Sequence, residues 1–383
     1  MNALESPFNT LTLKRFPESR DRSLRAWDAA DELLLNHLHE HCQSLLGGTA
    51  RVLICNDAHG SLACALHESL PHSWSDSFLA HSALHTNWQA NALADKPRVL
   101  TSLQAPDGVF DLVVIKIPKT QALLEHQLAS LIPHIHADTV VIAASLVRHL
   151  YRSAFSLLEK YLGPVSTSLA VKKARLVFTQ LQISDLAPKS PYPDSYTDKA
   201  LGFTLHNHAN VFCRDRVDAA ARLVTQHADK LGLADSVIDL GCGNGVLGIY
   251  LQQLQPQAHL TFVDESYMAV ESARMNHTTL CSEHSPQARF EVANGLSPFD
   301  DQSAALILCN PPFHAQHAVA LDSARDFFKQ AARVLKPHGE LWVVANKHLA
   351  YKRTLTNHFH ECKVIASNSG FVIYSASKPM QSD

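Results

Sequence analysis

The chain has 383 residues, of which 46% are hydrophobic and 18% charged. This length exceeds what one hydrophobic core usually supports, and the composition is that of an ordinary folded protein, so we expect two domains. A net charge of −3 gives no global sign of a nucleic-acid partner, so a basic contact surface would have to be local. No apolar run has the length of a signal peptide core or a membrane span, and we expect a cytoplasmic protein without membrane contact.

Neither the cysteines nor the histidines form a metal-binding pattern. The eight cysteines are isolated from one another and show no CxxC spacing, which indicates a reducing compartment and no disulfide framework. His206 and His208 are separated by one residue, but no third ligand follows at a suitable spacing. Local hydrogen bonding therefore explains this pair better than a metal does, and we expect no metal site.

The first half of the chain alternates apolar strands with helices. An apolar cluster at Leu11, Leu13 and Phe16 fits an edge strand. Further strands are expected at 51–55, 99–100, 110–117, 139–144 and 171–178, and helices at 27–46, 62–70, 87–93, 123–132 and 148–162. This alternation predicts a doubly wound, mostly parallel sheet. The segment 184–197 contains three prolines and no periodicity, so we expect a linker there between domains at 1–183 and 198–383.

The second half shows the same alternation and ends differently from a nucleotide-binding dehydrogenase. Strands are expected at 237–240, 259–263, 289–292, 304–309, 340–345, 362–366 and 371–375, with helices at 217–230, 323–335 and 349–359. A final helix followed by a hairpin predicts a seven-strand sheet with a reversed last strand. That ending is typical of methyltransferases and not of nicotinamide domains.

The stretch VIDLGCGNGVLG, residues 237–248, predicts a strand that passes through a glycine-rich turn into a helix. Glycine lets the backbone approach a ligand closely, and the helix start offers free N–H groups. Gly243, Gly245 and Gly248 fit the G-x-G-x-x-G pattern of nicotinamide enzymes, and Asp264 follows about twenty residues later, as that fingerprint requires. These residues alone leave two classes of cofactor open.

Asp239 separates the two classes, because the dinucleotide fingerprint has no acidic residue in the strand before its glycines. With Gly241 it gives D-x-G-x-G-x-G, and a carboxylate at this place can hold the α-ammonium group of S-adenosylmethionine. Asp264 would accept hydrogen bonds from the ribose hydroxyls of either cofactor. Asn294, just after the third strand, is placed to meet the adenine, although Asn294-Gly295 also fits a simple turn.

The tetrapeptide Asn-Pro-Pro-Phe at 310–313 follows the fourth strand and indicates the reaction. An exocyclic amine on a base is a poor nucleophile, because its lone pair is delocalised into the ring. The Asn310 side-chain oxygen and the Pro311 carbonyl can accept both amine hydrogens and direct the lone pair toward a methyl donor. Pro311 and Pro312 restrict the backbone that carries these acceptors, and Phe313 can stack on a flipped base.

The two halves resemble each other at an offset near two hundred residues, as a duplicated domain would. RVLICNDAHGSLACAL matches SVIDLGCGNGVLGIYL, FDLVVIKIPK matches AALILCNPPF, and ADTVVIAASL matches HGELWVVANK. In the first copy Gly60 is the one glycine retained in this stretch, and Lys-Ile-Pro-Lys stands where the second copy has Asn-Pro-Pro-Phe. We interpret the first half as a degenerate twin that keeps the fold and not the chemistry.

The whole chain resembles bacterial rRNA guanine-N2 methyltransferases, in particular the G type, which acts on large-subunit rRNA. The resemblance is carried by LTLKRFP, AWDAADELLL, VIKIPKTQALLE, VKKARLVF, HNHANVFCR, CNPPFHAQHA and VANKHLAYK; the C type, which acts on small-subunit rRNA, shares the architecture. The resemblance implies two tandem Rossmann-like class I methyltransferase domains, the first degenerate. It also implies transfer of a methyl group from S-adenosylmethionine to the 2-amino group of a single guanosine in 23S rRNA.

By this resemblance the cofactor would be lined by Asp239, Gly241, Gly243, Gly245, Asp264 and Asn294, and the guanine would be held by residues 310–313. Phe212 and Arg214 would close over the cofactor or substrate. The candidates for RNA contact are cations in strands and loops, with phosphate contacts carrying most of the affinity: Lys172, Lys173, Arg175, Arg214, Arg216, Lys347, Lys352 and Arg353.

Other interpretations of the same residues stay open at this point. The same chemistry suits a guanosine of 16S rRNA, a DNA adenine or a protein glutamine as acceptor, and a non-enzymatic RNA-binding assembly factor would also fit the first half. We expect a monomer whose partner is large-subunit rRNA, either free of protein or partly assembled.

Overall fold

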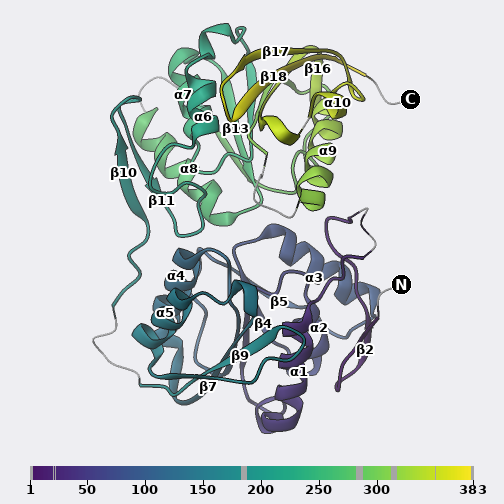
Figure 1. Cartoon of the computed structure of the whole chain (residues 1–383), viewed down its shortest axis with the longest axis vertical. Helices are drawn as coiled ribbons and strands as arrows, with labels where there is room; N and C mark the ends of the chain where they lie inside the picture. Colours follow the sequence, from purple (N-terminus) through teal and green to yellow (C-terminus); the bar gives the residue numbers. More distant parts are fainter. Residues whose placement is uncertain are drawn as a thin grey trace. The chain divides into compact units, whose positions relative to one another are not determined.

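The computed structural model describes residues 3–19, 21, 23–182, 188–281, 288–311, 317–349 and 351–380, and the chain divides into two compact units, Met1–Tyr192 and Pro193–Asp383 (Figure 1). Each unit is built around its own seven-stranded sheet, and the two sheets have the same topology. Among the described helices, none combines the length and apolar character that a membrane crossing requires.

The sheet of the first unit has the strand order β5-β4-β3-β6-β7-β9-β8, with β9 antiparallel to both of its neighbours. Its strands are β3 Val52–Cys55, β4 His72–Ser75, β5 Arg98–Thr101, β6 Phe110–Lys116, β7 Ile135–Leu146, β8 Val165–Thr167 and β9 Ala174–Thr179. Its helices are α1 Ala29–His41, α2 Ser61–Ala65, α3 Phe78–Ala90, α4 Gln121–Leu131 and α5 Arg152–Leu162. A separate pair, β1 Ala3–Glu5 and β2 Thr10–Thr12, precedes them.

The sheet of the second unit has the corresponding order β14-β13-β12-β15-β16-β18-β17. Its strands are β12 Ser236–Leu240, β13 His259–Asp264, β14 Arg289–Val292, β15 Ala304–Cys309, β16 Leu335–Asn346, β17 Phe359–Ser367 and β18 Phe371–Pro379. Its helices are α6 Ala219–Thr225, α7 Val246–Leu254, α8 Tyr267–Leu280, α9 His317–Val334 and α10 Tyr351–Leu355. Because β18 runs antiparallel to β16 and β17, the predicted reversed last strand is confirmed.

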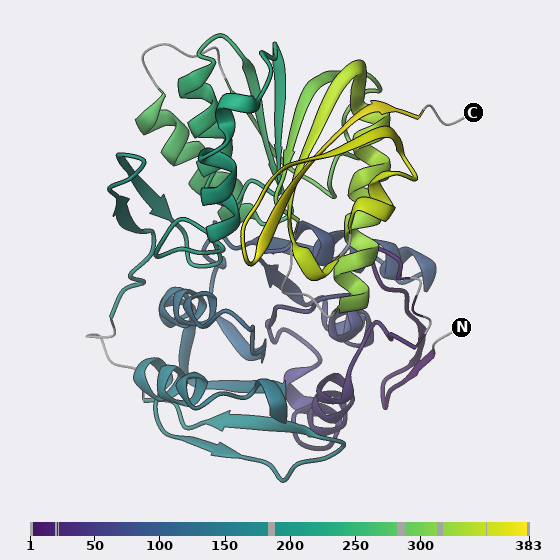
Figure 2. The same ribbon diagram turned by 45° about the horizontal axis from the view of Figure 1, so that its top comes forward.

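Both sheets are covered by helices on their two faces, as the alternating apolar side chains of the strands require. In the second unit, Val237 and Leu306 pack in the same cluster as Ala220 of α6 and Leu247 of α7. The opposite face packs against α9 and α10 through another cluster, which includes Phe328. Figure 2 shows α9 on one side of this sheet and α6 and α7 on the other. Parallel strands buried on both faces place their loops, and any site built from them, at the carboxyl edge of the sheet.

Several predicted boundaries are wrong. The strand β4 was not predicted, and the helix expected at 87–93 begins at Phe78, where Ser77 caps it. The strand expected at 171–178 begins at Ala174, because the preceding lysines form a turn. The expected linker 184–197 ends in β10 Asp194–Asp198, which pairs with β11 Phe203–Asn207. Residues 183–187 lie outside the described part.

Candidate active site

Between β12 and α7 the chain makes a tight turn that contains three glycines in the left-handed backbone region. The φ angles are 71° at Gly241, 54° at Gly243 and 82° at Gly245, which a residue with a side chain adopts at a cost of about 1–2 kcal/mol. A Cβ atom on Gly245 would lie 3.0 Å from Ala273 of α8, whereas one on Gly243 would meet no atom within 4 Å. Gly245 therefore permits close packing of α7 on α8, and Gly243 leaves open space beside the turn.

Asp239, the residue before the end of β12, is buried, with 1% of its surface exposed. Its Oδ2 accepts a hydrogen bond from the Gly248 N–H at 2.9 Å, and burial raises the pKa of this carboxyl to about 7. A Cβ atom on Gly248 would lie 3.0 Å from this oxygen and 2.6 Å from the ring of Phe262. The fourth glycine thus serves packing, and its bond to Asp239 was not predicted from the sequence. The contact of Asp239 with a cofactor ammonium group stays a prediction.

Asp264, at the end of β13, connects the glycine turn with the start of α8. Its Oδ2 accepts from the Gly243 N–H at 3.0 Å, and its Oδ1 accepts from the Ser266 N–H at 3.0 Å. Its carbonyl oxygen also accepts from the N–H of Ala293, the residue before Asn294, at 3.0 Å. The predicted cofactor residues Asp239, Asp264 and Asn294 therefore lie at or just after the carboxyl ends of three neighbouring strands.

Asn310 directly follows β15, and the NH2 end of its side-chain amide forms a hydrogen bond. Nδ2 donates to Oδ2 of Asp218 at 3.1 Å, whereas Oδ1 is buried and has no hydrogen-bond partner among the described residues. A Cβ atom on Gly241 would lie 3.5 Å from the carbonyl oxygen of Asn310, so the glycine turn runs beside the end of β15. Pro311 is buried next to it. The predicted site residues Pro312 and Phe313 lie outside the described part.

A chain of asparagine amides ties the segment before α6 to the glycine turn. The Asn244 Nδ2 donates to Oδ1 of Asn207 at 2.9 Å, and the Asn207 Nδ2 donates to the carbonyl oxygen of Arg214 at 3.1 Å. The Asn276 Nδ2 of α8 donates to the Asn244 carbonyl oxygen at 3.0 Å. All three asparagines are buried, so this network fixes the segment that carries Phe212 and Arg214. Asn207 belongs to the HNHANVFCR motif, but nothing in that motif predicted the network.

Across the described ranges, no group of three or more His, Cys, Asp or Glu side chains is placed to hold a metal ion. All eight cysteines are free thiols, and most of them are buried.

Two family models match the chain. The RLMG N-terminal domain matches residues 1–183, and the methyltransferase small domain matches residues 202–375. Over 380 residues the chain is 46% identical to the ribosomal RNA large subunit methyltransferase G of Ectopseudomonas mendocina, an alignment that covers 99% of this chain and 100% of the relative. The chain belongs to the ribosomal RNA large subunit methyltransferase G family. The protein of the same name from Stutzerimonas stutzeri is 45% identical with the same coverage.

A solved structure with the same two-unit architecture supports the predicted fold class. T. thermophilus RsmC, a 16S rRNA N2 methyltransferase solved in complex with AdoMet and guanosine, matches 98% of this chain and 97% of its own chain. The TM-score is 0.77 and the sequence identity 21%. The prediction of two tandem Rossmann-like methyltransferase domains is thereby confirmed.

In this member of the methyltransferase G family, the position of Asn310 has a counterpart in the first unit. Ile115 pairs with the last residue of β3, as Cys309 pairs with the last residue of β12. The next residue along each chain segment is Lys116 in the first unit and Asn310 in the second. A lysine therefore occupies the place of the candidate catalytic amide.

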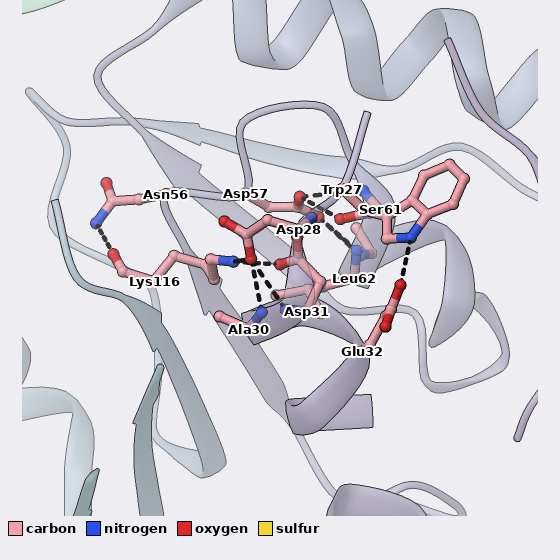
Figure 3. A network of polar contacts seen from close by, with 11 residues as sticks. Trp27, Asp28, Ala30, Asp31, Glu32, Asn56, Asp57, Ser61, Leu62 and Lys116 are labelled. Carbon is pink, nitrogen blue, oxygen red and sulfur yellow. Dashed lines mark hydrogen bonds and ion pairs between the residues drawn. The ribbon is translucent and has the colours of Figure 1, made fainter. Parts of the chain in front are cut away.

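Charged side chains lie around Lys116 at the carboxyl edge of the first unit's sheet (Figure 3). The Lys116 ammonium lies 3.0 Å from Oδ1 of Asp28 and 2.5 Å from Oδ1 of Asp31. Burial opposes its charge, but the two carboxylates outweigh that effect and raise the pKa of Lys116. Asp57 accepts hydrogen bonds from the N–H groups at the start of α2, and burial raises its pKa to about 6. The anion-binding end of this helix is thus occupied by a carboxylate of the same chain.

The three RNA-contact candidates of the first unit do not share one strand, contrary to the prediction from the sequence. Lys172 and Lys173 form a turn with φ angles of 47° and 64°, and the Lys172 Nζ lies 2.8 Å from the Glu32 carboxylate. Arg175 lies in β9 and is half-buried. Of these, Lys173 is exposed and has no ionic partner within the described part of the chain.

The two RNA-contact candidates of the second unit, Arg214 and Lys347, also differ in how far other side chains engage them. The Arg214 Nε donates to Oδ2 of Asp194 at 3.0 Å, which engages part of its guanidinium. Lys347 follows β16 and is exposed. Phe212, predicted to close over the site, is 47% exposed.

Proposed function

We propose that this protein transfers a methyl group from S-adenosylmethionine to the exocyclic 2-amino group of a guanosine in 23S rRNA. The observation that carries the proposal is the buried Oδ1 of Asn310, an acceptor without a partner among the described residues. Leaving such an acceptor unsatisfied costs about 1–3 kcal/mol, which a substrate donor would recover. It lies where the glycine turn meets the end of β15.

The residues around the turn fit the cofactor. Gly243 leaves space beside the backbone, Asp264 is oriented by two backbone N–H groups, and Asp239 is a buried carboxyl that a cation would stabilise in its ionised form. We assign the amino-acid end to Asp239, the ribose to Asp264 and the adenine to Asn294. When bound, S-adenosylmethionine would supply an electrophilic methyl group.

The chain's own residues prepare the amine for that methyl group. Asn310 Oδ1 and the Pro311 carbonyl oxygen would each accept one amine hydrogen, which localises the nitrogen lone pair. Pro311 and Pro312 limit the backbone freedom of this segment, so little ordering remains when the substrate binds. Phe313 would stack on the guanine, and Phe212 and Arg214 would cover the site.

The acceptor is proposed from the relatives together with the motif. The names of the curated relatives specify large-subunit ribosomal RNA, and RsmC is an N2 methyltransferase with guanosine bound. We propose that 198–383 is the catalytic domain, that 184–197, whose last four residues form the start of β10, connects the two domains, and that 1–183 recognises RNA, with the exposed Lys173 and Lys347 among the phosphate contacts. Such a protein would act as a monomer in the cytoplasm.

Substitution of Asn310 tests the mechanism. In N310A, methyl transfer should be lost, whereas the dissociation constant of S-adenosylmethionine, measured by calorimetry, should stay within about twofold of the parent. Asn357, exposed after α10, provides the matched control N357A, which should retain full transfer. Transfer by N310A at the parent rate would refute the proposed role.

The acceptor requires a separate experiment. Protein-free 23S rRNA, protein-free 16S rRNA and assembled subunits should each be incubated with tritiated cofactor, and the labelled nucleosides identified by mass spectrometry. We expect N2-methylguanosine in 23S rRNA alone. Labelled N6-methyladenosine, or N2-methylguanosine confined to 16S rRNA, would contradict the assignment.

A further inference from the structure

The orientation of the Asn310 amide is decided by Asp218, a residue outside the Asn-Pro-Pro-Phe motif. An asparagine amide has a donor end and an acceptor end of nearly the same shape, and its two orientations differ by a half-turn. An ionised carboxylate contains only acceptors, so the end of the amide that faces Asp218 must be the NH2 group. The Nδ2 lies 3.1 Å from Asp218 Oδ2, which leaves Oδ1 facing away from the carboxylate as an acceptor that none of the described residues engages.

Asp218 is itself held by the backbone of α6 and does not depend on Asn310 for its position. It is the N-cap residue of this helix, and its Oδ2 accepts from the N–H groups of Ala220 at 3.2 Å and Ala221 at 3.4 Å. Ala220 and Ala221 are buried in the core beneath β16 and β18. The carboxylate is therefore fixed to the scaffold, and its contact with Asn310 transmits that fixed position to the amide.

The first unit contains a corresponding contact between a helix N-cap aspartate and a residue at a strand end, but that residue is a lysine. Asp28 is the N-cap of α1, which packs on β7 and β9 as α6 packs on β16 and β18. Its Oδ1 accepts from the Ala30 N–H at 2.7 Å and lies 3.0 Å from the ammonium of Lys116, as Figure 3 shows. Lys116 occupies the position of Asn310. In both units a cap aspartate thus contacts a residue at a strand end, Lys116 as the last residue of β6 and Asn310 directly after β15. An ammonium, however, cannot accept the hydrogens of an amine.

We propose that Asp218 is a positioning residue for methyl transfer: it holds the Asn310 amide in the orientation that presents Oδ1 to the substrate amine. The inference rests on the proposed function. Without this contact the amide can turn and present its NH2 group to the amine, which places donor against donor. Loss of this contact therefore lowers the rate of methyl transfer and does not weaken binding of the cofactor.

Two substitutions separate this role from helix capping. Serine caps a helix about as well as aspartate but is too short to reach Asn310, so D218S keeps the cap and releases the amide. In D218N the new NH2 group can donate to Asn310 Oδ1, so the Asn310 amide can also adopt the inverted orientation. For both variants we expect kcat to fall about 10- to 100-fold, the range that one hydrogen bond to a charged group supports. The KM for RNA and the cofactor dissociation constant should change less than about threefold.

Arg222 supplies the matched control, because it lies on the same helix and forms an ion pair with Asp198 away from Asn310. R222A should weaken α6 and lower the unfolding temperature at least as much as D218S, while kcat stays within about twofold of the parent. A kcat for D218S and D218N within about twofold of the parent, with N310A inactive, would overturn the role of Asp218 alone. Active N310A would instead refute the proposed function itself.

Discussion

The buried carboxyl of Asp239 makes the stability of the second unit depend on pH in a direction opposite to that of most salt-bridged acids. Its pKa in the folded protein is about 7, against an ordinary value of 3.8. A difference of about 3 units corresponds to roughly 4 kcal/mol. Because the folded state binds the proton more tightly, the unfolding free energy falls as pH rises from about 4 to about 7.

The variant D239N removes this titration and keeps an oxygen that can accept from the Gly248 N–H. Its new NH2 group has a fixed penalty if it finds no acceptor, about 1–3 kcal/mol, but that penalty does not vary with pH. The stability of D239N relative to the parent should therefore improve by roughly 3 kcal/mol between about pH 5 and about pH 8, whatever its absolute value.

Hydrogen-exchange mass spectrometry across a urea series measures this for each unit separately. Peptides from residues 236–254 should show the pH-dependent difference, and peptides from residues 1–182 of the same sample should not. Saturating S-adenosylmethionine should stabilise the parent more than D239N, because the cofactor's ammonium group favours the ionised carboxyl. A difference between D239N and the parent that stays constant with pH would refute the buried-carboxyl reasoning.

Three further substitutions test the packing around the two sites. In G243A the Cβ atom meets open space at a φ of 54°, so the unfolding free energy should fall by only about 1–2 kcal/mol. Calorimetry should nevertheless show a cofactor affinity at least tenfold lower than that of the parent. An unchanged affinity would contradict the assigned cofactor position. In G248A the Cβ atom would lie 2.6 Å from Phe262, so urea unfolding should show a loss of about 1–3 kcal/mol in unfolding free energy. A variant as stable as the parent would contradict this packing argument. In K116M the carboxylates of Asp28 and Asp31 lose their cation, so peptides of the first unit should unfold about 3–5 kcal/mol more easily; a stabilised first unit would mean that the acids simply take up protons.

The sequence was informative where apolar runs coincide with strands, and uninformative where polar residues are buried. The strand β4 was missed because its sequence His-Ser-Trp-Ser contains no apolar run, although Ser73, Trp74 and Ser75 are all buried. The turn at Lys172 and Lys173 contains no glycine, so nothing in the local pattern announces its left-handed backbone. The first error arises because tertiary packing overrides local propensity. The second arises because Val171 and Ala174 close a two-residue turn by backbone hydrogen bonds that the lysine side chains do not signal.

For the site, local motifs located the backbone elements but not the contacts between them. Asp239, Asp264 and Asn310 were placed correctly at strand ends, because glycine turns and Asn-Pro-Pro-Phe follow apolar runs. The contact between Asp218 and Asn310 joins residues 92 positions apart, and neither carries a signal for the other. The helix expected at 217–230 begins at Ala219 with Asp218 as its N-cap, so the capping role of Asp218 was missed as well. Its contact with Asn310 forms only in the folded sheet, where the end of β15 reaches the N-terminus of α6.

The two units share a backbone path and differ in the side chains at its carboxyl edge. Asn56 follows β3 where Gly241 follows β12, and its φ of 63° is close to the 71° of the glycine, so the backbone follows the same path without a glycine. Asparagine tolerates that region better than most residues, and here its Nδ2 also donates to the Lys116 carbonyl oxygen at 3.0 Å. The side chains at the carboxyl edge differ: Asp57 accepts hydrogen bonds at the start of α2, and Lys116 stands where the second unit has Asn310. The Lys116 ammonium pairs with Asp28 and Asp31, so different side chains occupy this edge on sheets of the same topology.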